Sequence, residues 1–487
     1  MKMRSLKANA FLNGIKQICS IVFPFITFPY VSRILGNEGY GKFSFSYSIV
    51  YYFILFAALG IGTYAIREGP KIRDDNITVT KFCSQIFSIN VVSTFISCIA
   101  LLALIVLSVK VQSYALYILI QSTAMIMSLL GTDWVNSIFE DYLYITIRYI
   151  GVQVVALVLM FLFVRSPNDV WKYCVISVLA TNGGNLINIF YIRKYVKIRF
   201  TLHMEFSKHI RPLLVLFANA IASSIYVNAD VTMLGFYSTD SYVGVYSFAS
   251  KIYNMLKALI NSTINAAVPR ISYVIENEPE KYHEYVNEIF KGVNFFVFPI
   301  VTGLFLMSDS IIYCAGGSTY LSGSIALKIL SFATIFGIYG SLFSNCVLIV
   351  NRREDQCLKS TTVSAILNIG FNFIVIPLWG MNGAAVTTII AEASNFIMQA
   401  MYAKELFDWK RLDIKSVKSN LIGAVGIAMV CIIANLNFCD KVIKLFVAVP
   451  ISAVVYFSIL LIGKNDLMIS LCVKFGKIIK ELSCGSI

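Results

Sequence analysis

Long apolar runs, broken at short intervals by charged or turn-forming residues, recur along the whole 487-residue chain. Most runs reach the roughly 20 residues that an α-helix needs to cross the ~30 Å hydrocarbon core of a bilayer. The runs are continuous rather than alternating, which disfavours a membrane β-barrel. The pattern predicts an all-α polytopic membrane protein.

The composition agrees with this class. Charged residues make up 14% of the chain, against about 25% in a soluble domain. Fourteen transmembrane helices are predicted between the charged breaks. They span residues 10–32, 42–65, 82–108, 113–131, 146–164, 171–192, 212–234, 242–267, 292–314, 325–350, 360–378, 382–403, 419–436 and 442–463.

The basic residues predict how the chain is oriented in the membrane. With the N-terminus in the cytoplasm, 29 of the 40 Lys and Arg fall in inner segments and 8 in outer ones. Cytoplasmic loops carry such an excess of positive charge, so both termini are expected in the cytoplasm. Because these residues punctuate apolar runs, the net charge of +14 does not indicate a nucleic-acid partner. The eleven cysteines are scattered without metal-ligand spacing, so no metal site is predicted.

Two segments of the sequence resemble each other. Ile-Leu-Gly and Tyr-Gly-Lys-Phe-Ser-Phe within residues 34–45 match Met-Leu-Gly and Val-Gly-Val-Tyr-Ser-Phe within residues 233–248. Each copy joins two predicted helices, and the copies are offset by six helices, so both have the same orientation. Parallel repeats are typical of transporters that bind substrate between their halves. We expect an N-terminal lobe at 1–211, a C-terminal lobe at 212–411, and two additional helices with a cytoplasmic tail at 412–487.

The residues of the first predicted outer turn carry a family resemblance. The stretch PFITFPYVSRILGNEGYGKFS, residues 24–44, resembles the opening of the polysaccharide-biosynthesis flippases, the Wzx-type O-antigen and capsule repeat-unit transporters of the MOP exporter superfamily. Tyr-Ala-Ile-Arg-Glu-Gly at 64–69, Asp-Val-Thr-Met-Leu-Gly at 230–235 and Gly-Met-Asn-Gly-Ala-Ala at 380–385 are similar to the same group. The resemblance extends from residue 10 to about residue 405.

The resemblance implies two six-helix lobes around a central cavity and two further C-terminal helices. It implies a flippase that moves undecaprenyl-diphosphate-linked oligosaccharide from the inner to the outer leaflet of the bacterial inner membrane by alternating access. No catalytic residue and no cofactor are expected. Transport is expected to be coupled to an H⁺ or Na⁺ gradient. The expected partners are membrane lipids, a polysaccharide polymerase and the chain-length machinery, and not nucleic acid.

Two alternatives stay open. A multidrug or small-cation exporter of the same superfamily would favour acidic and aromatic cavity residues. A membrane enzyme of polysaccharide assembly, a polymerase or ligase, would need a sizeable outer loop with catalytic Arg or His, whereas all predicted outer loops are short.

Polar residues of the predicted helix 242–267 are the candidate substrate-binding residues. A charged side chain inside the bilayer costs a few kcal/mol, so it marks a candidate functional site. Lys251 and Lys257 each lie about 5 Å from the helix midpoint, and Asn254, Lys257, Asn261 and Asn265 share one helix face. We expect this face to line the cavity and its lysines to meet the diphosphate or acidic sugars. The alternative is a hydrogen-bonded seam between helices.

Two carboxylates are candidates for ion coupling. Glu392 falls near the middle of the predicted helix 382–403, where a buried charge must be neutralised by a proton or paired with a cation. It is therefore either a protonation-linked switch or the static partner of a lysine. Asp230 is the second candidate, although it is also expected to form an ion pair with Lys251.

The first predicted helix supplies the remaining candidates. Lys16 lies near its cytoplasmic end, where it is expected either to line the inward-facing cavity or to extend to the membrane surface. Pro24 and Pro29 each remove a backbone hydrogen bond, which predicts a kink or hinge.

Overall fold

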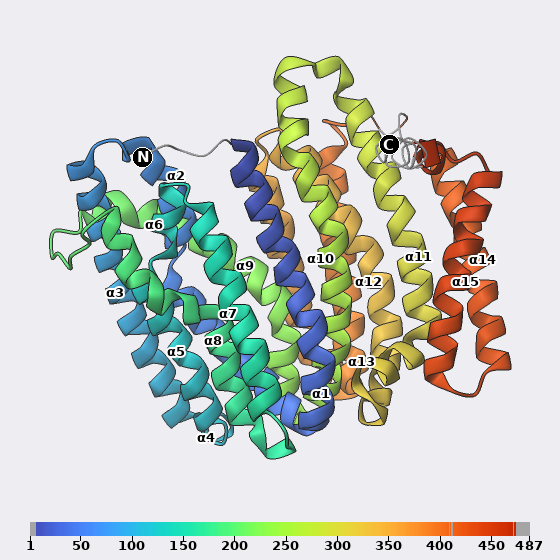
Figure 1. Ribbon diagram of the computed structural model, residues 1–487, viewed down its shortest axis with the longest axis horizontal. Coiled ribbons are helices and arrows are strands. Elements are labelled where there is room, and N and C mark those ends of the chain that lie inside the picture. The colour runs from blue at the N-terminus through green and yellow to red at the C-terminus, as the bar shows by residue number, and fades with distance from the viewer. Residues whose placement is uncertain (1–5, 409, 411–412, 471, 474–487) are drawn as a thin grey trace, which may run out of the picture. The chain divides into compact units, whose positions relative to one another are not determined.

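The computed structural model describes residues 6–470, except 409, 411 and 412, and residues 472–473 (Figure 1). For residues 6–11, 13, 223, 226 and 227 it describes the backbone alone. The described residues form helices and the turns between them, and they contain no β-strand. The predicted all-α class is confirmed.

The chain divides into two compact units, residues 1–247 and 248–487. The first unit contains α1 (Leu6–Ala58), α2 (Ile61–Glu68), α3 (Asn76–Leu107), α4 (Val109–Gln112), α5 (Ala115–Gly131), α6 (Asp133–Ile138), α7 (Tyr142–Phe163), α8 (Val170–Tyr191), α9 (Phe206–Tyr237) and the start of α10 (Asp240–Asn277). The second contains the rest of α10, α11 (Tyr282–Gly316), α12 (Ser324–Phe343), α13 (Glu354–Ala403), α14 (Ile414–Asn437) and α15 (Lys441–Ile462). The lobe boundary at residue 211 stays a prediction.

Helices lie in all fourteen predicted ranges, and two pairs of ranges are joined end to end. α1 contains the first range and the second as far as Ala58, and α13 contains the eleventh and twelfth. Within α1 the backbone leaves the helical region at Gly36 (φ 67°, ψ 178°), and within α13 it does so at Gly380 (φ 55°, ψ −132°). A positive φ is readily adopted only by glycine. These two residues therefore let one crossing end and the next begin without a loop.

Aspartates begin several of the helices. The side chains of Asp75, Asp413 and Asp440 each accept a hydrogen bond from a backbone N–H in the first turn of α3, α14 and α15 respectively. Such capping satisfies donors that have no partner within the helix. The charged residues that break the apolar runs of the sequence thus also fix where the helices start.

The segment at residues 268–291, between the predicted helices 242–267 and 292–314, is itself largely helical. α10 continues to Asn277 and α11 begins at Tyr282, so only a short turn containing the 3₁₀ segment Pro279–Lys281 connects them. Figure 1 shows this helical hairpin in yellow-green, extending beyond the neighbouring helices of the second unit. The polar sequence of this segment therefore covers two helix extensions.

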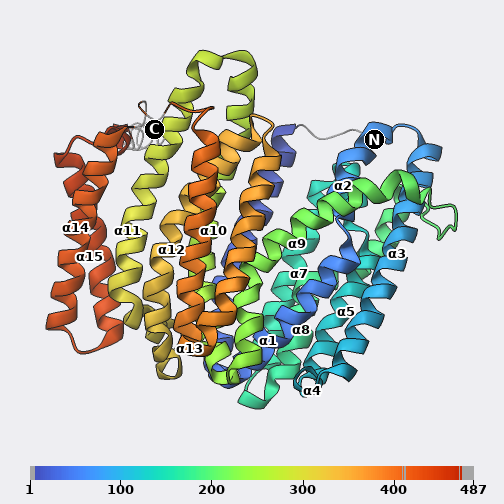
Figure 2. The same ribbon diagram turned by 180° about the vertical axis from the view of Figure 1, so that it is seen from behind.

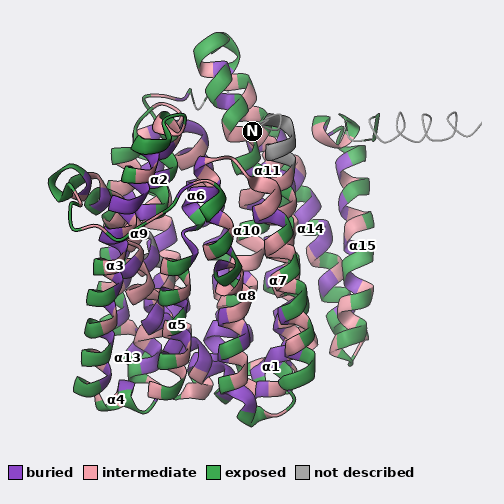
Figure 3. Ribbon diagram, turned by 60° about the vertical axis from the view of Figure 1, so that its left-hand side comes forward, coloured by how far each residue is buried: buried purple, intermediate pink, exposed green. Residues whose placement is uncertain are grey.

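The outer faces of many helices carry exposed apolar side chains. Phe95 and Leu107 of α3 are 65% and 83% exposed, and Phe446 and Val454 of α15 are 72% and 65% exposed. Figure 3 shows exposed positions along the sides of these helices. Nine helical segments of the described chain are long and apolar enough to cross a membrane. Because the backbone polar groups are paired within helices, such surfaces suit lipid, and the protein is a multi-pass membrane protein.

The second unit places α12 and α13 together. Its core includes Ile260 of α10, Val293 of α11, Ile338 and Leu342 of α12 and Ala403 of α13. Figure 2 shows α13, in orange, beside α12. This packing brings a polar residue of α13 to the polar face of α10.

Candidate functional site

A buried ion pair lies in the centre of the second unit. The ammonium of Lys257 donates to Oε1 of Glu392. The hydroxyl of Tyr253 donates to the same oxygen at 2.7 Å, and Nζ of Lys257 lies 3.3 Å from that hydroxyl. The side chains of Lys257 and Glu392 are 17% and 4% exposed. The carboxylate charge is thus matched by a cation and a second donor, as burial of a charge requires.

Three helices build this pair. Tyr253 and Lys257 are four residues apart on α10, so they lie on the same face one turn apart. Glu392 comes from the second half of α13. A Cβ on Gly337 of α12 would lie 2.7 Å from both Oε2 of Glu392 and Nζ of Lys257. Glycine at this position therefore leaves the space that the ion pair occupies.

Sequence reasoning identified Lys257 and Glu392 separately and did not assign a role to Tyr253 or Gly337. The signal for Tyr253 was its position one turn before Lys257 on the same polar face. Gly337 had no comparable signal, because an isolated glycine in an apolar helix has many packing roles. The expectation that Glu392 would be held by a lysine agrees with this geometry.

Lys251 lies in a different environment from Lys257. The side chain of Lys251 is exposed, and it makes no hydrogen bond or ion pair with the described residues of the second unit. Asn254, between the two lysines, is half-buried and donates to Oγ of Ser250 at 3.2 Å. α10 therefore presents one accessible ammonium group, Lys251, and one that is held by a carboxylate, Lys257.

The other two asparagines continue the polar face of α10. Oδ1 of Asn261 is buried and has no hydrogen-bond partner among the described residues. Asn265 is exposed, and its Oδ1 accepts a hydrogen bond from Nδ2 of Asn345 at 3.2 Å. The helix face predicted from residue spacing is therefore polar throughout. Of its three asparagines, only Asn265 forms a hydrogen bond to an asparagine outside α10, as the alternative of a hydrogen-bonded seam between helices requires.

Asp230 of α9 is buried in the first unit. Its Oδ2 accepts a hydrogen bond from the hydroxyl of Tyr246 at 2.6 Å, and the residue is 4% exposed. The expected ion pair between Asp230 and Lys251 joins residues of different units and stays a prediction.

Lys16 of α1 lies beside a cluster of polar residues in the first unit. Its ammonium is 5.7 Å from the ring centroid of Tyr149, a cation–π contact. Nη2 of Arg148, on α7, is 2.6 Å from Oδ1 of Asp133, and both residues are close enough to act electrostatically on Lys16. Lys16 is half-buried, which is compatible with either role expected for it.

α1 remains helical at Pro24 and Pro29. Gly36 is the one described position in α1 where the backbone dihedrals leave the helical region. A bend or hinge at the two prolines stays a prediction.

The two copies of the sequence repeat pack against each other within the first unit. A Cβ on Gly41 would overlap the carbonyl oxygen of Asp240, and a Cβ on Gly244 would overlap that of Asn37. Nδ2 of Asn37 also donates to Oγ of Ser241 at 2.8 Å. The equivalent glycines of the repeat thus allow backbone-to-backbone contact between α1 and the start of α10.

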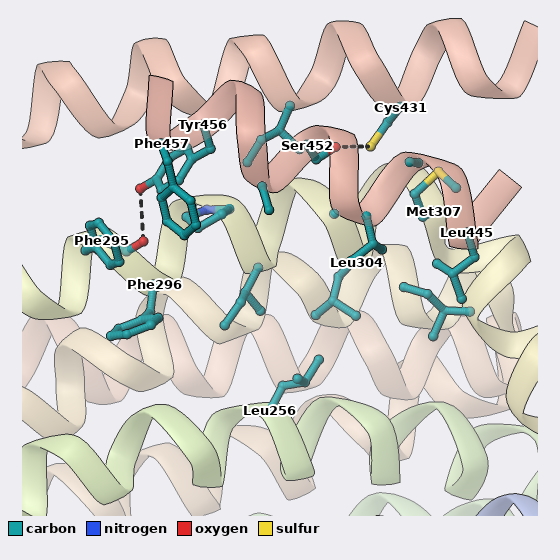
Figure 4. A pocket seen from close by; sticks show the side chains of 18 residues that line it. Leu256, Phe295, Phe296, Leu304, Met307, Cys431, Leu445, Ser452, Tyr456 and Phe457 are labelled. Atoms are coloured by element: carbon teal, nitrogen blue, oxygen red, sulfur yellow. Dashed lines mark hydrogen bonds between the residues drawn. The ribbon is translucent and has the colours of Figure 1, made fainter. Parts of the chain in front are cut away.

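An apolar groove lies elsewhere in the second unit (Figure 4). It has a volume of about 410 Å³ and is lined mainly by α11, α14 and α15. Phe296, Leu304 and Leu445 point into it, and Leu256 of α10 lies on its far side. The hydroxyl of Tyr456 donates a hydrogen bond to the backbone carbonyl of Phe295 at 2.9 Å. The groove therefore offers an apolar surface suited to a hydrocarbon chain.

Sequence comparisons place the chain among proteins of polysaccharide export. Residues 6–275, more than half of the chain, match the family of polysaccharide biosynthesis proteins. A protein of Escherichia coli (strain K12) that is named as a candidate O-antigen transporter is 24% identical over 82% of this chain and 97% of its own length. A capsular polysaccharide biosynthesis protein of Staphylococcus aureus is 20% identical over 81% of this chain and 98% of its own.

Structural comparisons identify the fold. The lipid II flippase MurJ in an inward closed conformation matches with a TM-score of 0.71 and 19% identity, over 95% of this chain and 99% of that one. An inward-facing multidrug resistance transporter of the MATE family, of the MOP superfamily, matches with a TM-score of 0.58 and 14% identity, over 79% of this chain and 93% of that one. The names of the O-antigen transporter relative and of these two structures agree with the expectation of a transporter rather than an enzyme. Because the matched family covers more than half of its residues, the chain belongs to the family of polysaccharide biosynthesis proteins.

Proposed function

We propose that this protein moves undecaprenyl-diphosphate-linked oligosaccharide repeat units from the inner to the outer leaflet of the bacterial inner membrane, for O-antigen or capsule assembly. The observation that carries the proposal is the polar face of α10, which presents two lysines within the predicted transmembrane segment 242–267. The anionic part of such a substrate needs cationic partners inside the bilayer, and ammonium groups supply them.

The two lysines have different proposed roles. Lys251 is accessible and has no carboxylate partner within the described residues of the second unit, so it is the first contact for the diphosphate or an acidic sugar. Lys257 is held by Glu392 and becomes available to the anion only if that pair opens. The asparagines of the same face, Asn254, Asn261 and Asn265, offer donors and acceptors to sugar hydroxyl groups.

Glu392 is the proposed coupling residue. A proton on this carboxylate would remove its negative charge and so weaken its attraction for Lys257, which could then turn to the substrate. A ligand that binds one state better shifts an alternating equilibrium towards that state, so a proton gradient would give transport its direction. Sodium is the alternative ion. Asp230 is a second coupling candidate because it too is buried in the predicted bilayer region.

The remaining contacts follow from the shape of the substrate. The isoprenoid tail is apolar and either stays in the lipid or lies in the groove of α11, α14 and α15, which is lined almost entirely by apolar side chains. Lys16 would meet the anionic group on the cytoplasmic side, and Pro24 and Pro29 would let α1 bend during alternating access. The termini would lie in the cytoplasm, and a polymerase with its chain-length machinery would take the product on the outer side.

The test is deletion of the gene followed by analysis of lipid-linked intermediates and surface glycan. Loss of surface polymer, with the intermediates kept on the inner leaflet, supports flipping. Intermediates that reach the outer leaflet but are not polymerised contradict it and favour the assembly enzyme. Restored surface polymer from the wild-type gene, but not from a Lys251→Ala variant made at the same level, would connect the function to the α10 face.

A further inference from the structure

A basic pocket in the first unit shares no residue with the α10 face. It has a volume of about 690 Å³ and opens between the first turns of α3 and the segment that follows α8. Asn76, Thr80 and Ser84 contribute from one face of α3. Five basic residues line it: Lys81, Arg193, Lys194, Lys197 and Arg199.

The segment after α8 is held along α3 by its backbone. The N–H of Arg199 donates to Oγ of Ser84 at 3.2 Å, and the N–H of Thr201 donates to Oγ of Ser88 at 2.8 Å. The side chains of an extended segment alternate between its two faces. Val196 is accordingly buried, while Lys197 and Arg199 are both exposed towards the pocket.

The basic residues of the pocket exceed the carboxylates that neutralise them. Nζ of Lys81 is 2.5 Å from Oε1 of Glu205, and Nζ of Lys194 is 3.9 Å from Oδ2 of Asp141. The carboxylate of Asp75, at the start of α3, accepts from the N–H of Ile77 and the hydroxyl of Thr78.

Arg193, Lys197 and Arg199 have no carboxylate partner in the described part of the chain. The guanidinium of Arg193 lies 5.4 Å from the ring centroid of Phe190, a position that leaves its N–H groups available. The pocket is therefore strongly cationic and open to an anion, and arginine is well suited to phosphate.

Exposed apolar side chains accompany the basic residues of the pocket. Ile77, which lines the pocket at the start of α3, is 83% exposed, and Phe190, whose ring lies against Arg193, is 69% exposed. Basic residues beside exposed aliphatic and aromatic side chains are typical of surfaces that lie at the membrane–water boundary. A free phosphate or nucleotide would contact the basic residues but would gain nothing from the exposed apolar side chains.

We propose that this pocket binds the headgroup of an anionic phospholipid of the cytoplasmic leaflet, with the acyl chains beside Ile77 and Phe190. Arg193, Lys197 and Arg199 contact the phosphate, and the polar side chains of Asn76 and Thr80 contact the glycerol part of the headgroup. Basic pockets between transmembrane helices on the cytoplasmic side are suited to such lipids. The site is separate from the transport face and does not depend on the proposed substrate.

The test uses native mass spectrometry of the full chain in detergent, with phosphatidylglycerol or phosphatidylcholine of the same acyl chains added. The test variant is Arg193→Gln/Lys197→Gln/Arg199→Gln. The matched control is Lys404→Gln/Lys410→Gln/Lys418→Gln, which removes three exposed charges from the second unit. Each basic residue near an anionic lipid contributes roughly fivefold to binding, so the test variant should lose about a hundredfold in phosphatidylglycerol affinity, and at least tenfold.

The wild-type chain and the control should keep their preference for phosphatidylglycerol. An equal loss in both variants, or a test variant within twofold of the wild type, would overturn the proposal. Displacement of phosphatidylglycerol by millimolar inorganic phosphate would assign the pocket to a free anion instead and would also overturn it. If the test variant does not keep the thermal transition of the wild type, the single variant Lys197→Gln replaces it, with a loss of about fivefold expected.

Discussion

Removal of one partner from the Lys257–Glu392 pair should destabilise the second unit strongly. Glu392→Gln keeps the shape of the side chain but removes the carboxylate that faces the ammonium of Lys257. Lys257→Met removes the cation and leaves a carboxylate that is 4% exposed, with the Tyr253 hydroxyl as a remaining donor at 2.7 Å. Each single variant therefore keeps one buried charge without the opposite charge that balances it in the wild type.

The size of the effect follows from burial. Removing one member of a buried ion pair costs about 3–5 kcal/mol, whereas replacing both members with neutral groups is often close to neutral. Since the Lys257 side chain is 17% exposed, water relieves part of the cost, and we expect about 3 kcal/mol. For a cooperative unit of the size of residues 248–487, about 1 kcal/mol corresponds to roughly 2 °C. Each single variant should lose about 6 °C, and the double variant Lys257→Met/Glu392→Gln should recover most of it.

The assay is thermal unfolding of the four purified proteins in one detergent, followed by flipping in proteoliposomes with and without an imposed pH gradient. If the losses of the two single variants simply add in the double variant, the two residues are not energetically coupled and the reasoning fails. If the stable double variant still responds to the gradient as the wild type does, Glu392 is not the coupling residue.

Three further predictions rest on single residues, and one concerns orientation. Lys251→Ala should abolish surface polymer without lowering the protein level or the unfolding temperature, because Lys251 is exposed and has no carboxylate partner within the described residues of the second unit; an active variant would remove it from the mechanism. Gly337→Ala should weaken the ion pair, since its Cβ would lie 2.7 Å from both charged groups; an unchanged unfolding temperature would contradict this. Gly244→Ala should lower the amount of folded protein in the membrane, because its Cβ would overlap the carbonyl oxygen of Asn37; wild-type levels of folded protein by fluorescence-detected size exclusion would be evidence against the contact. A reporter fused after Lys194 should read cytoplasm and one fused after Thr239 the outer side; the reverse result would invalidate the assigned orientation.

The sequence alone determined the type of structure and the approximate positions of the long helices. The reason is physical: a bilayer accepts only helices whose backbone groups are paired internally, so a run of about 20 apolar residues has few other structures available. It also located the breaks within α1 and α13, since Gly36 and Gly380 lie where one predicted crossing ends and the next begins. The sequence also shows charged residues inside apolar runs, and these residues include Lys251, Lys257 and Glu392.

Only the tertiary structure decided what those charges do. Lys251 and Lys257 are six residues apart on one helix and look alike in the sequence, yet one is accessible and the other is paired with a carboxylate 135 positions away. The 3.6-residue period of a helix assigns a side chain to a face but not to a neighbour. The neighbour is set by how α10, α12 and α13 pack, and that depends on the volumes of many apolar side chains at once. Gly337 illustrates the difference, because its role becomes apparent only when the space that it leaves is seen to hold the two charged groups.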